Sequence, residues 1–168
     1  MNQATILPVT SDEDIQKVAI LADEIWHQHY VPIIGQAQVD YMIEKFQSFP
    51  AMCTQIRTDG YEYFQIFSKD CLAGYIGIRV EETSLFLSKL YIKKDCRGLG
   101  LASKAIGFLK NLCSERGLNR IYLTCNIHNH HSLAAYDRLG FKITDSVVGD
   151  IGNGFVMDDY LLELKINA

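Results

Sequence analysis

Apolar residues recur at steps of three and four in the first part of the chain, which is the spacing of one helix face. The series is Ile15, Val18, Ala22, Ile25 and His29. Thr10 and Glu13 stand at the spacing of a capping box, so they predict where this helix begins. Val31-Pro32 predicts where it ends, because proline lacks the N–H that a helix interior uses.

Further elements are predicted before the pattern of the chain changes. A second helix covers about Gln36–Phe46 and turns another apolar series inward, namely Val39, Met42, Ile43 and Phe46. A short helical piece follows Pro50 and stops by Gly60. Ahead of all the helices, Thr5–Val9 has the composition of a short strand.

From Tyr61 onward the apolar residues follow a period of two, which is typical of strands. Three successive strands are predicted at Tyr61–Phe67, Leu72–Val80 and Ser84–Ile92. Polar residues mark the turns between them, at Lys69-Asp70 and Glu81-Glu82. The centre of the chain is therefore expected to be an antiparallel meander.

The second half of the chain alternates between helices and strands. A glycine-containing loop at Asp95–Gly100 leads into a helix that ends at Gly117. The later elements are a strand at Ile121–Cys125, a helix at Asn129–Leu139 closed by Gly140, and two strands at Phe141–Val148 and Phe155–Leu164 around Gly149–Gly154. This order predicts an α/β protein with a mixed, largely antiparallel central sheet flanked by helices, folded as a single domain over residues 1–168.

The composition excludes several classes of protein. Hydrophobic residues make up 48% of the 168 residues, charged residues 21%, and the net charge is -4, so no nucleic-acid-binding surface is expected. Neither a membrane span nor a signal peptide is predicted, because the chain has no apolar stretch of about 18 residues and no basic-then-apolar leader. The five cysteines form no C-x-x-C pair, which is typical of reduced thiols, most of them in the core of a cytoplasmic protein.

A loop between a strand and a helix carries the sharpest chemical signal. Its sequence runs Arg97-Gly98-Leu99-Gly100-Leu101-Ala102-Ser103. Backbone N–H groups at a helix start have no intrahelical partner and the helix dipole adds positive charge, so a pyrophosphate can bind there. The loop matches neither a Walker loop nor the dinucleotide fingerprint, since Ser103 stands where a third glycine is required. The alternative is a tight turn in which the glycines only relieve strain.

A second signal follows the strand at Ile121–Cys125. Asn129, Ser132 and Tyr136 are separated by three and four residues, so they share one helix face. The phenol of Tyr136 is a candidate proton donor to a departing thiolate, and Asn129 offers both a donor and an acceptor. The alternative is that Tyr136 is a packing aromatic and Asn129 only a helix cap.

Together the two segments resemble the GNAT superfamily of acyl-CoA-dependent N-acetyltransferases. The [QR]-x-x-G-x-[GA] loop of that family is matched by Arg97, Gly100 and Ala102. Its N-x-x-[SA]-x-x-x-Y-x-x-x-G-F segment is matched by Asn129, Ser132, Tyr136, Gly140 and Phe141. The order of elements is similar to the family fold along nearly the whole chain. The resemblance therefore implies a GNAT-like sheet with a splayed pair of strands that binds coenzyme A.

The resemblance also implies roles for these segments toward acetyl-CoA. The strand Leu85–Ile92 is expected to splay from Ile121–Cys125, with the pantetheine arm along the backbone of Leu90, Tyr91 and Ile92. The amides of Arg97–Ser103 are expected to hold the pyrophosphate. A backbone N–H at Leu90 or Tyr91 is expected to polarise the thioester carbonyl. Tyr136 and Asn129 are expected to contact the coenzyme and to be catalytic, with Tyr136 protonating the leaving thiolate.

The acceptor side is less determined. The first two helices usually line it in this family, so Trp26, His29 and Tyr30 are predicted to face the amine, with ordinary core packing as the alternative. The base that deprotonates the amine is undecided among Glu24, His27, His29, Glu81, Glu82, His128 and His130. No metal site is predicted for the run His128–His131, because adjacent residues on a helix turn diverge.

The predicted function is direct transfer of an acetyl group from acetyl-CoA, as co-substrate, to a primary amine of a small molecule or peptide. One alternative is acetylation of a protein lysine or N-terminus, and another is a non-catalytic acyl-CoA-binding module. No nucleic-acid or membrane partner is expected, and a homodimer is compatible with the sequence.

Overall fold

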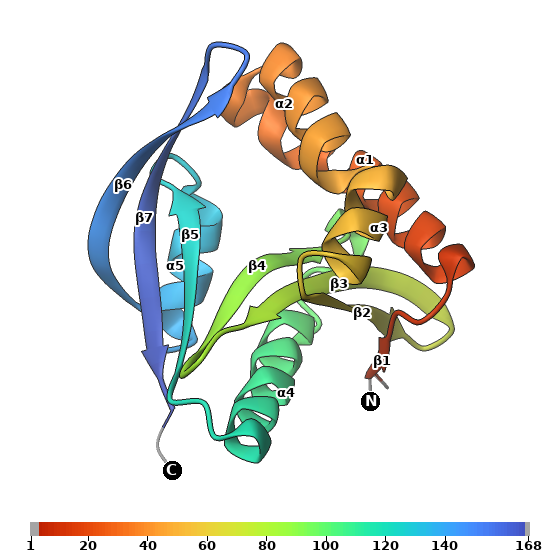
Figure 1. Ribbon diagram of the computed structural model, residues 1–168, viewed down its shortest axis with the longest axis vertical. Helices are drawn as coiled ribbons and strands as arrows, with labels where there is room; N and C mark the ends of the chain where they lie inside the picture. Colours follow the sequence, from red (N-terminus) through yellow and green to blue (C-terminus); the bar gives the residue numbers. More distant parts are fainter. Residues whose placement is uncertain (1–3, 167–168) are drawn as a thin grey trace. The chain divides into compact units, whose positions relative to one another are not determined.

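The computed structural model describes residues 4–166 (Figure 1). The chain divides into two compact units. The first contains the chain up to Arg79 together with Lys89–Ala105, and the second contains Val80–Ser88 together with the chain from Ile106 onward. The organisation of residues 1–168 as a single domain stays a prediction.

The first unit begins with a strand and a layer of helices. These elements are β1 (Ala4–Pro8), α1 (Asp12–Ile34), α2 (Gln36–Met42), the π-helix η1 (Ile43–Gln47) and α3 (Phe49–Arg57). The cap of α1 is Ser11, whose Oγ accepts from the N–H of Asp14 at 3.1 Å, so the prediction of Thr10 was wrong by one residue. The predicted stop at Val31-Pro32 was also wrong, because α1 continues to Ile34 and is capped by Gly35, where φ is 87°. Pro32 cannot donate to the carbonyl of Gln28 and its ring crowds that carbonyl, but its fixed φ is helical, and the helix runs on for two more residues.

The π-helix changes which residues of the second predicted helix face inward. Val39 and Met42 are buried as predicted. A π-turn holds more residues than an α-turn, so the inward face rotates beyond Met42. Gln47, with 3% of its surface exposed, is buried in place of Phe46, and its Oε1 accepts from the hydroxyl of Tyr75 at 2.9 Å. The apolar spacing that placed Phe46 inward assumed an α-helical period throughout.

The predicted meander is confirmed. Its strands are β2 (Tyr61–Ser68), β3 (Cys71–Val80) and β4 (Ser84–Ile92). β2 pairs antiparallel with both β1 and β3. At Gly74 an added Cβ would stand 2.4 Å from the carbonyl oxygen of Tyr91, so only glycine allows β3 and β4 to approach this closely.

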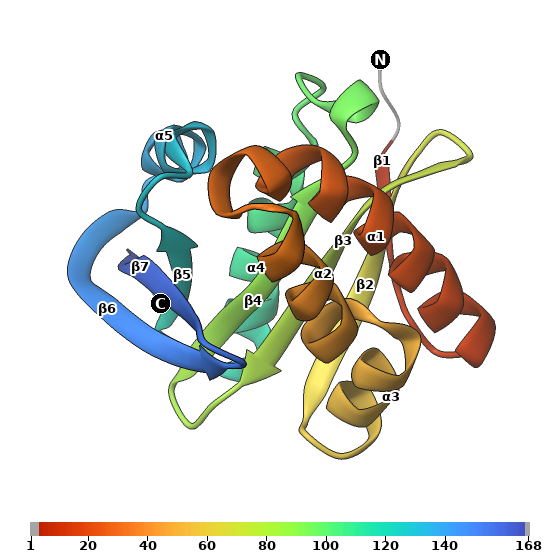
Figure 2. The ribbon, with the colours of Figure 1, turned by 90° about the horizontal axis from the view of Figure 1, so that it is seen from above.

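The remaining elements follow a short 3-10 turn, η2 (Lys94–Cys96). They are α4 (Leu101–Arg116), β5 (Arg120–Asn126), α5 (His130–Arg138), β6 (Lys142–Gly152) and β7 (Phe155–Lys165). β6 and β7 form a long hairpin (Figure 2) closed by Asn153-Gly154, with φ values of 55° and 79°. Two positive φ values suit a two-residue turn that matches the strand twist. β6 therefore extends into Gly149–Gly154, which was predicted to be a loop.

The strand order is β1-β2-β3-β4-β5-β7-β6, a mixed and mostly antiparallel seven-stranded sheet, as predicted. β4 pairs with β5 in parallel, with Ser84 opposite Arg120, Leu85 opposite Ile121 and Phe86 opposite Tyr122. Within the second unit, the fully buried side chains come from the helix and strands alike: Leu85, Ile106, Leu109, Ile121, Phe141 and Leu162. This apolar packing holds β5 and β7 in position.

Candidate active site

The loop before α4 presents backbone N–H groups that lack backbone partners. Gly98 and Gly100 have φ values of 79° and 76°, and nothing lies within 4 Å of the place where a Cβ would stand on either. Within residues 4–166, the N–H groups of Gly98–Ser103 donate to no backbone carbonyl, whereas the N–H of Lys104 donates to Gly100 at 3.0 Å. Unpaired amides beneath open space fit the predicted anion site.

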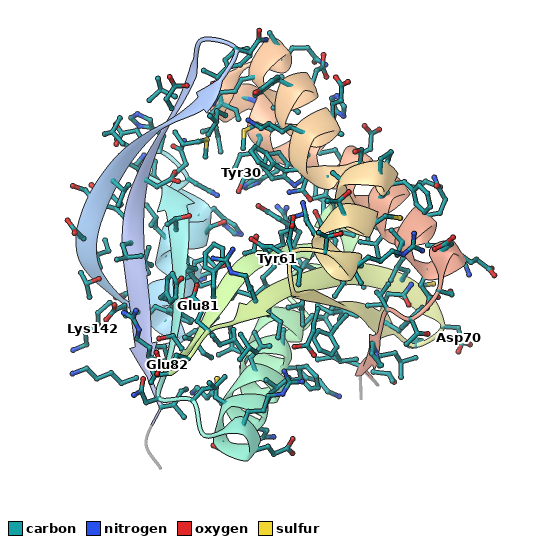
Figure 3. The ribbon with its side chains drawn as sticks, viewed as in Figure 1. Tyr30, Tyr61, Asp70, Glu81, Glu82 and Lys142 are labelled. Atoms are coloured by element: carbon teal, nitrogen blue, oxygen red, sulfur yellow. The ribbon has the colours of Figure 1, made fainter. Side chains whose placement is uncertain are left out.

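The predicted acceptor residues of α1 form one aromatic cluster. The ring centroid of Tyr30 lies 4.4 Å from that of Trp26 and 4.8 Å from that of His29 (Figure 3 labels Tyr30). Tyr91 of β4 joins them, with its ring 5.5 Å from Trp26 and 6.1 Å from Tyr30. Trp26 is buried, which fits the packing alternative, while His29, Tyr30 and Tyr91 are half-buried. The cluster thus joins predicted acceptor residues to a predicted coenzyme residue.

Asn129 and Tyr136 both belong to the α5 segment. Asn129 is buried and caps the helix, since its Oδ1 accepts from the N–H of Ser132 at 3.5 Å. Asn129 therefore does cap α5, and its contact with the coenzyme stays a prediction. Tyr136 is half-buried, and its ring stands edge-on to Phe141 with centroids 5.4 Å apart. A packing role for this ring is also present, and its role as a proton donor stays a prediction.

Two of the candidate bases already have strong partners. The Nε2 of His27 lies 2.8 Å from Asp40 Oδ1, and its Nδ1 lies 2.9 Å from the carbonyl oxygen of Asp23. The hydrogen bond to Asp40, followed by that to Asp23, raises the pKa of His27. Both ring nitrogens therefore already have partners in the protein. Glu81 accepts from the hydroxyl of Tyr122 with both oxygens, at 2.7 and 2.8 Å.

The other candidate bases lie toward the surface. Glu24 is 4.0 Å from Lys93, and Glu82 is exposed in the β3–β4 turn (Figure 3). His128 and His130 are exposed, with ring centroids 6.4 Å apart. None of these side chains is buried as a tuned catalytic base usually is.

Lys89 was missed from the sequence. It lies on β4 with 4% of its surface exposed, and burial lowers its pKa to about 7. Its Nζ donates to the carbonyl of Phe46 at 2.6 Å, to Gln55 Oε1 at 2.9 Å, and to the hydroxyl of Tyr63. The sequence did carry a signal for Lys89. Leu85, Leu87 and Lys89 are alternate residues of one strand, so they point to the same face, and the other residues of that face are apolar.

Asp159 on β7 was also missed. It is 9% exposed, and burial, followed by the charge of Asp158, raises its pKa to about 6. Its Oδ1 is buried and has no hydrogen-bond partner among the described residues. The sequence gives no local sign of this, because Asp158 and Asp159 are adjacent and identical in type.

The cysteines and other features add little chemistry. All five cysteines are free, but only Cys113 and Cys125 are buried, so the expectation that most lie in the core was wrong. Cys71 is exposed because it opens β3 at a tight turn.

Over residues 4–166, no three His, Cys, Asp or Glu side chains converge as a metal site would require. No helix of that region has the length and apolarity to cross a bilayer.

Similar folds are found in solved N-acetyltransferases. The chain superposes with a TM-score of 0.81 on PaiA N-acetyltransferase of Thermoplasma acidophilum in complex with coenzyme A, at 18% identity, covering 97% of this chain and 99% of that one. The ribosomal-protein-S18-alanine N-acetyltransferase of Escherichia coli gives a TM-score of 0.70 at 17% identity, covering 99% and 96%. Spermidine N-acetyltransferase of Vibrio cholerae, solved with CoA and spermine, gives 0.69 at 17% identity, covering 98% and 96%. At these identities the likeness establishes the fold.

Sequence similarity points the same way. A Bacillus subtilis (strain 168) protein named for alanine N-acetylation of ribosomal protein bS18 is 28% identical over 83 residues, which is 49% of this chain. The match spans 55% of the length of that relative. The model of the acetyltransferase (GNAT) family matches residues 21–141, which is most of the chain and includes both predicted motifs. The chain therefore belongs to the acetyltransferase (GNAT) family.

Proposed function

We propose that this protein transfers an acetyl group from acetyl-CoA directly to a primary amine of a small molecule or peptide. The observation that carries the proposal is the loop before α4, where Gly98 and Gly100 leave open space above amides with no backbone partner. A coenzyme pyrophosphate supplies the anion that such a helix start binds. Family membership supports the choice of coenzyme A.

The coenzyme contacts proposed in the first unit are made by backbone. The amides of Arg97, Gly98, Leu99, Gly100, Leu101, Ala102 and Ser103 bind the pyrophosphate, and the backbone of Leu90, Tyr91 and Ile92 binds the pantetheine arm. The side chain of Arg97 helps to fix the start of this loop, since its Nε donates to the carbonyl of Ile92 at 3.3 Å. A backbone N–H at Leu90 or Tyr91 stabilises the negative charge that develops on the thioester oxygen.

The proton for the leaving thiolate comes from Tyr136 in this proposal. A phenol with an ordinary pKa near 10 can donate to a thiolate as it forms. Asn129 contributes by fixing the start of α5, the helix that carries Tyr136. Its cap bond to Ser132 and its buried position support that role.

The acceptor amine is proposed to lie against the aromatic cluster of Trp26, His29 and Tyr30. Aromatic faces attract ammonium groups, so the half-buried rings of His29 and Tyr30 suit an acceptor that arrives protonated. The similar proteins include ones named for acetylation of spermidine and of an alanine of a ribosomal protein. A polyamine and an alanine-starting peptide are therefore the first acceptors to test.

The cellular setting completes the proposal. The free cysteines support a reducing, cytoplasmic location. A homodimer is the proposed assembly, and a spermidine N-acetyltransferase of Vibrio cholerae is described as dodecameric, so assembly does occur in this fold.

The test is release of free thiol from acetyl-CoA with a panel of polyamines, amino acids, aminoglycosides, an alanine-starting peptide and a lysine-containing protein. Turnover with a small amine or peptide supports the proposal. Turnover with the protein lysine alone favours a protein acetyltransferase. Tight acetyl-CoA binding by calorimetry, with no thiol release for any amine, identifies a non-catalytic acyl-CoA-binding module.

A further inference from the structure

Lys89 stands at the centre of a buried polar network in the first unit, and the proposed reaction does not use it. Its Nζ donates to the carbonyl of Phe46, to Gln55 Oε1 and to the hydroxyl of Tyr63. Gln55 Nε2 donates to the same carbonyl at 3.0 Å, and the hydroxyl of Tyr63 donates to Gln55 Oε1. The four residues come from η1, α3, β2 and β4, so one network ties together four elements of the unit.

An ammonium group at this place has a cost. Lys89 is 4% exposed, and burial lowers its pKa to about 7. Within residues 4–166 its Nζ bonds only to uncharged oxygens, so no carboxylate offsets that cost. A methionine fills a similar volume without burying a charge. Packing alone therefore does not account for a lysine here, and its hydrogen bonds point to a role.

The network fixes the end of the π-helix. Phe46 lies in the last turn of η1, where backbone carbonyls have no later helical N–H to pair with. Lys89 brings both a donor and a positive charge to this negative end of the helix. The next residue, Gln47, is buried and accepts from the hydroxyl of Tyr75 at 2.9 Å. Lys89 therefore helps to set where Gln47 meets Tyr75.

Tyr75 links this network to the aromatic cluster. Its ring centroid lies 5.4 Å from that of Tyr91, and the ring of Tyr91 contacts those of Trp26 and Tyr30. A second link runs along β4, because Lys89 and Tyr91 are alternate residues of one strand and point to the same face. Both links lie within the first unit.

The strand next to β4 leaves room for the lysine. A Cβ added to Gly77 of β3 would stand 3.3 Å from Cβ of Lys89 and 3.2 Å from Cζ of Tyr63. Both distances are shorter than ordinary van der Waals contact, so a larger residue at this position would press on two members of the network. Glycine at position 77 thus allows Lys89 and Tyr63 to pack this closely against β3.

We propose that Lys89 is a positioning residue for the acceptor amine. Its hydrogen bonds hold η1 and α3 against the sheet, and through Gln47 and Tyr75 they fix the ring of Tyr91 in the aromatic cluster. Lys89 touches no substrate itself, so the role needs no opening to solvent beside it. The inference rests on the proposed binding of the amine at the aromatic cluster, and it adds a residue that sets amine affinity from within the same unit.

The experiment compares Lys89→Met with Lys45→Met, using thiol release with spermidine and with an alanine-starting peptide. Lys45 is the matched control because it is a lysine of η1 itself but is exposed. Lys89→Met is expected to raise the amine KM about five- to tenfold, the order expected for one lost bond to a charged group. The kcat and the acetyl-CoA Kd are expected to stay within about twofold. Lys45→Met is expected to leave all three values unchanged.

A substitution of the partner separates positioning from general stability. Gln55→Leu removes the amide that bonds both Lys89 and the Phe46 carbonyl, so it is expected to raise the amine KM by a similar factor. In the double variant the rise should fall short of the product of the two single effects, because both changes break one network. Ile78→Val, a buried change on β3, should lower the melting temperature without changing the amine KM.

Hydrogen exchange adds a measurement that does not depend on turnover. The backbone amides of η1 and α3 should exchange several-fold faster in Lys89→Met than in Lys45→Met. Equal exchange rates overturn the proposal, and so does an unchanged amine KM in folded Lys89→Met. Equal rises in the amine KM and the acetyl-CoA Kd, or effects that multiply in the double variant, also overturn it. If the wild-type protein releases no thiol with any amine, the proposed acetyl transfer itself has failed, and this inference fails with it.

Discussion

The two compact units each bury a titratable side chain, and they treat it differently. Lys89 in the first unit is 4% exposed and uses all three ammonium protons, on the Phe46 carbonyl, Gln55 and Tyr63. Asp159 in the second unit is 9% exposed and keeps an oxygen without a partner. A satisfied group of this kind holds helices and strands together, whereas a buried oxygen without a partner lowers the stability of the fold.

The difference suggests how the work is divided. The side chains proposed to act in the first unit bind the amine, and its backbone binds the coenzyme and stabilises the thioester oxygen; the proposed proton donor, Tyr136, lies in the second unit. Substitutions in the first unit should therefore change affinity or stability, while those in the second should change kcat. The following substitutions test this division.

The largest effect is expected for Tyr136→Phe. Removing one positioned acid costs about 10²–10⁴-fold in rate, so kcat should fall by that order while acetyl-CoA affinity stays nearly constant. The ring contact with Phe141 survives this change, because only the hydroxyl is lost. Steady-state kinetics and a calorimetric titration are the measurements, with Tyr160→Phe as a control in the same unit. If kcat stays within about twofold while acetyl transfer limits the rate, solvent supplies the proton instead.

A binding effect of about tenfold is expected for Gly100→Val. The branched side chain would occupy the open space above the loop amides, and about 1.4 kcal/mol is a tenfold change in Kd. Gly117→Val is the matched control, since Gly117 also has positive φ (70°) and open surroundings but lies at the far end of α4. Both variants should lose similar stability, and only Gly100→Val should weaken acetyl-CoA binding in calorimetry. Equal affinities would assign the loop glycines to turn geometry alone.

The two buried groups should give opposite pH dependences of stability. Lys89 has a pKa lowered to about 7 when folded, so unfolding takes up a proton and the free energy of unfolding rises with pH above 7. Asp159 has its pKa raised from 3.8 to about 6, so unfolding releases a proton and stability falls as the pH rises from 4 to 6. Each slope is at most about 1.4 kcal/mol per pH unit.

Denaturant unfolding of Lys89→Met and Asp159→Asn measures these slopes by difference from the wild-type protein. At pH 7, Asp159→Asn is expected to be as stable as the wild-type protein or more so, since a buried charge is gone. A flat difference for Lys89→Met from pH 7 to pH 9 would mean that its three hydrogen bonds offset the cost of burial. That result would sharpen the contrast with Asp159.

The smallest effect is expected for Tyr30→Ala. If the aromatic cluster binds the acceptor, the KM for the amine should rise several-fold, and the KM for acetyl-CoA should change less. Val18→Ala, a buried position on the same helix, serves as a stability control. An equal rise in both KM values together with a lower melting temperature would indicate that Tyr30 packs in the core and does not contact the amine.

Local patterns predicted the fold well where the relevant physics is local. Alternation placed β2, β3 and β4 within a residue or two, and the family motifs identified the GNAT family, which is confirmed. The π-helix at Ile43–Gln47 was not predicted, because no residue type marks a π-helix and its formation depends on packing. Pro32 was misjudged because a proline disfavours the helix around it without forbidding it, and α1 continues through Pro32 to Ile34.

The site was harder to predict than the fold. The loop glycines and the Tyr136 segment are contiguous motifs, so they could be found by spacing. Asp159 owes its raised pKa first to burial, and it lies opposite Asn126, a residue 33 positions earlier in the sequence that the register of two strands brings there. This pairing joins β5 to β7, which are separated in the sequence by α5 and β6, so it cannot be inferred from adjacent residues.

That dependence limits how the hairpin can change during evolution. Asn153-Gly154 closes β6 and β7 with two residues of positive φ, and it fixes which residues of the strands oppose one another. One inserted or deleted residue on the β7 side of this turn can be absorbed in only two ways. Either a new bulge forms, or β7 shifts by one position, which sends every following side chain to the opposite face. Lineages that keep a carboxylate beside Asn126 should therefore conserve the length between these two strands more strictly than the residues in the turn.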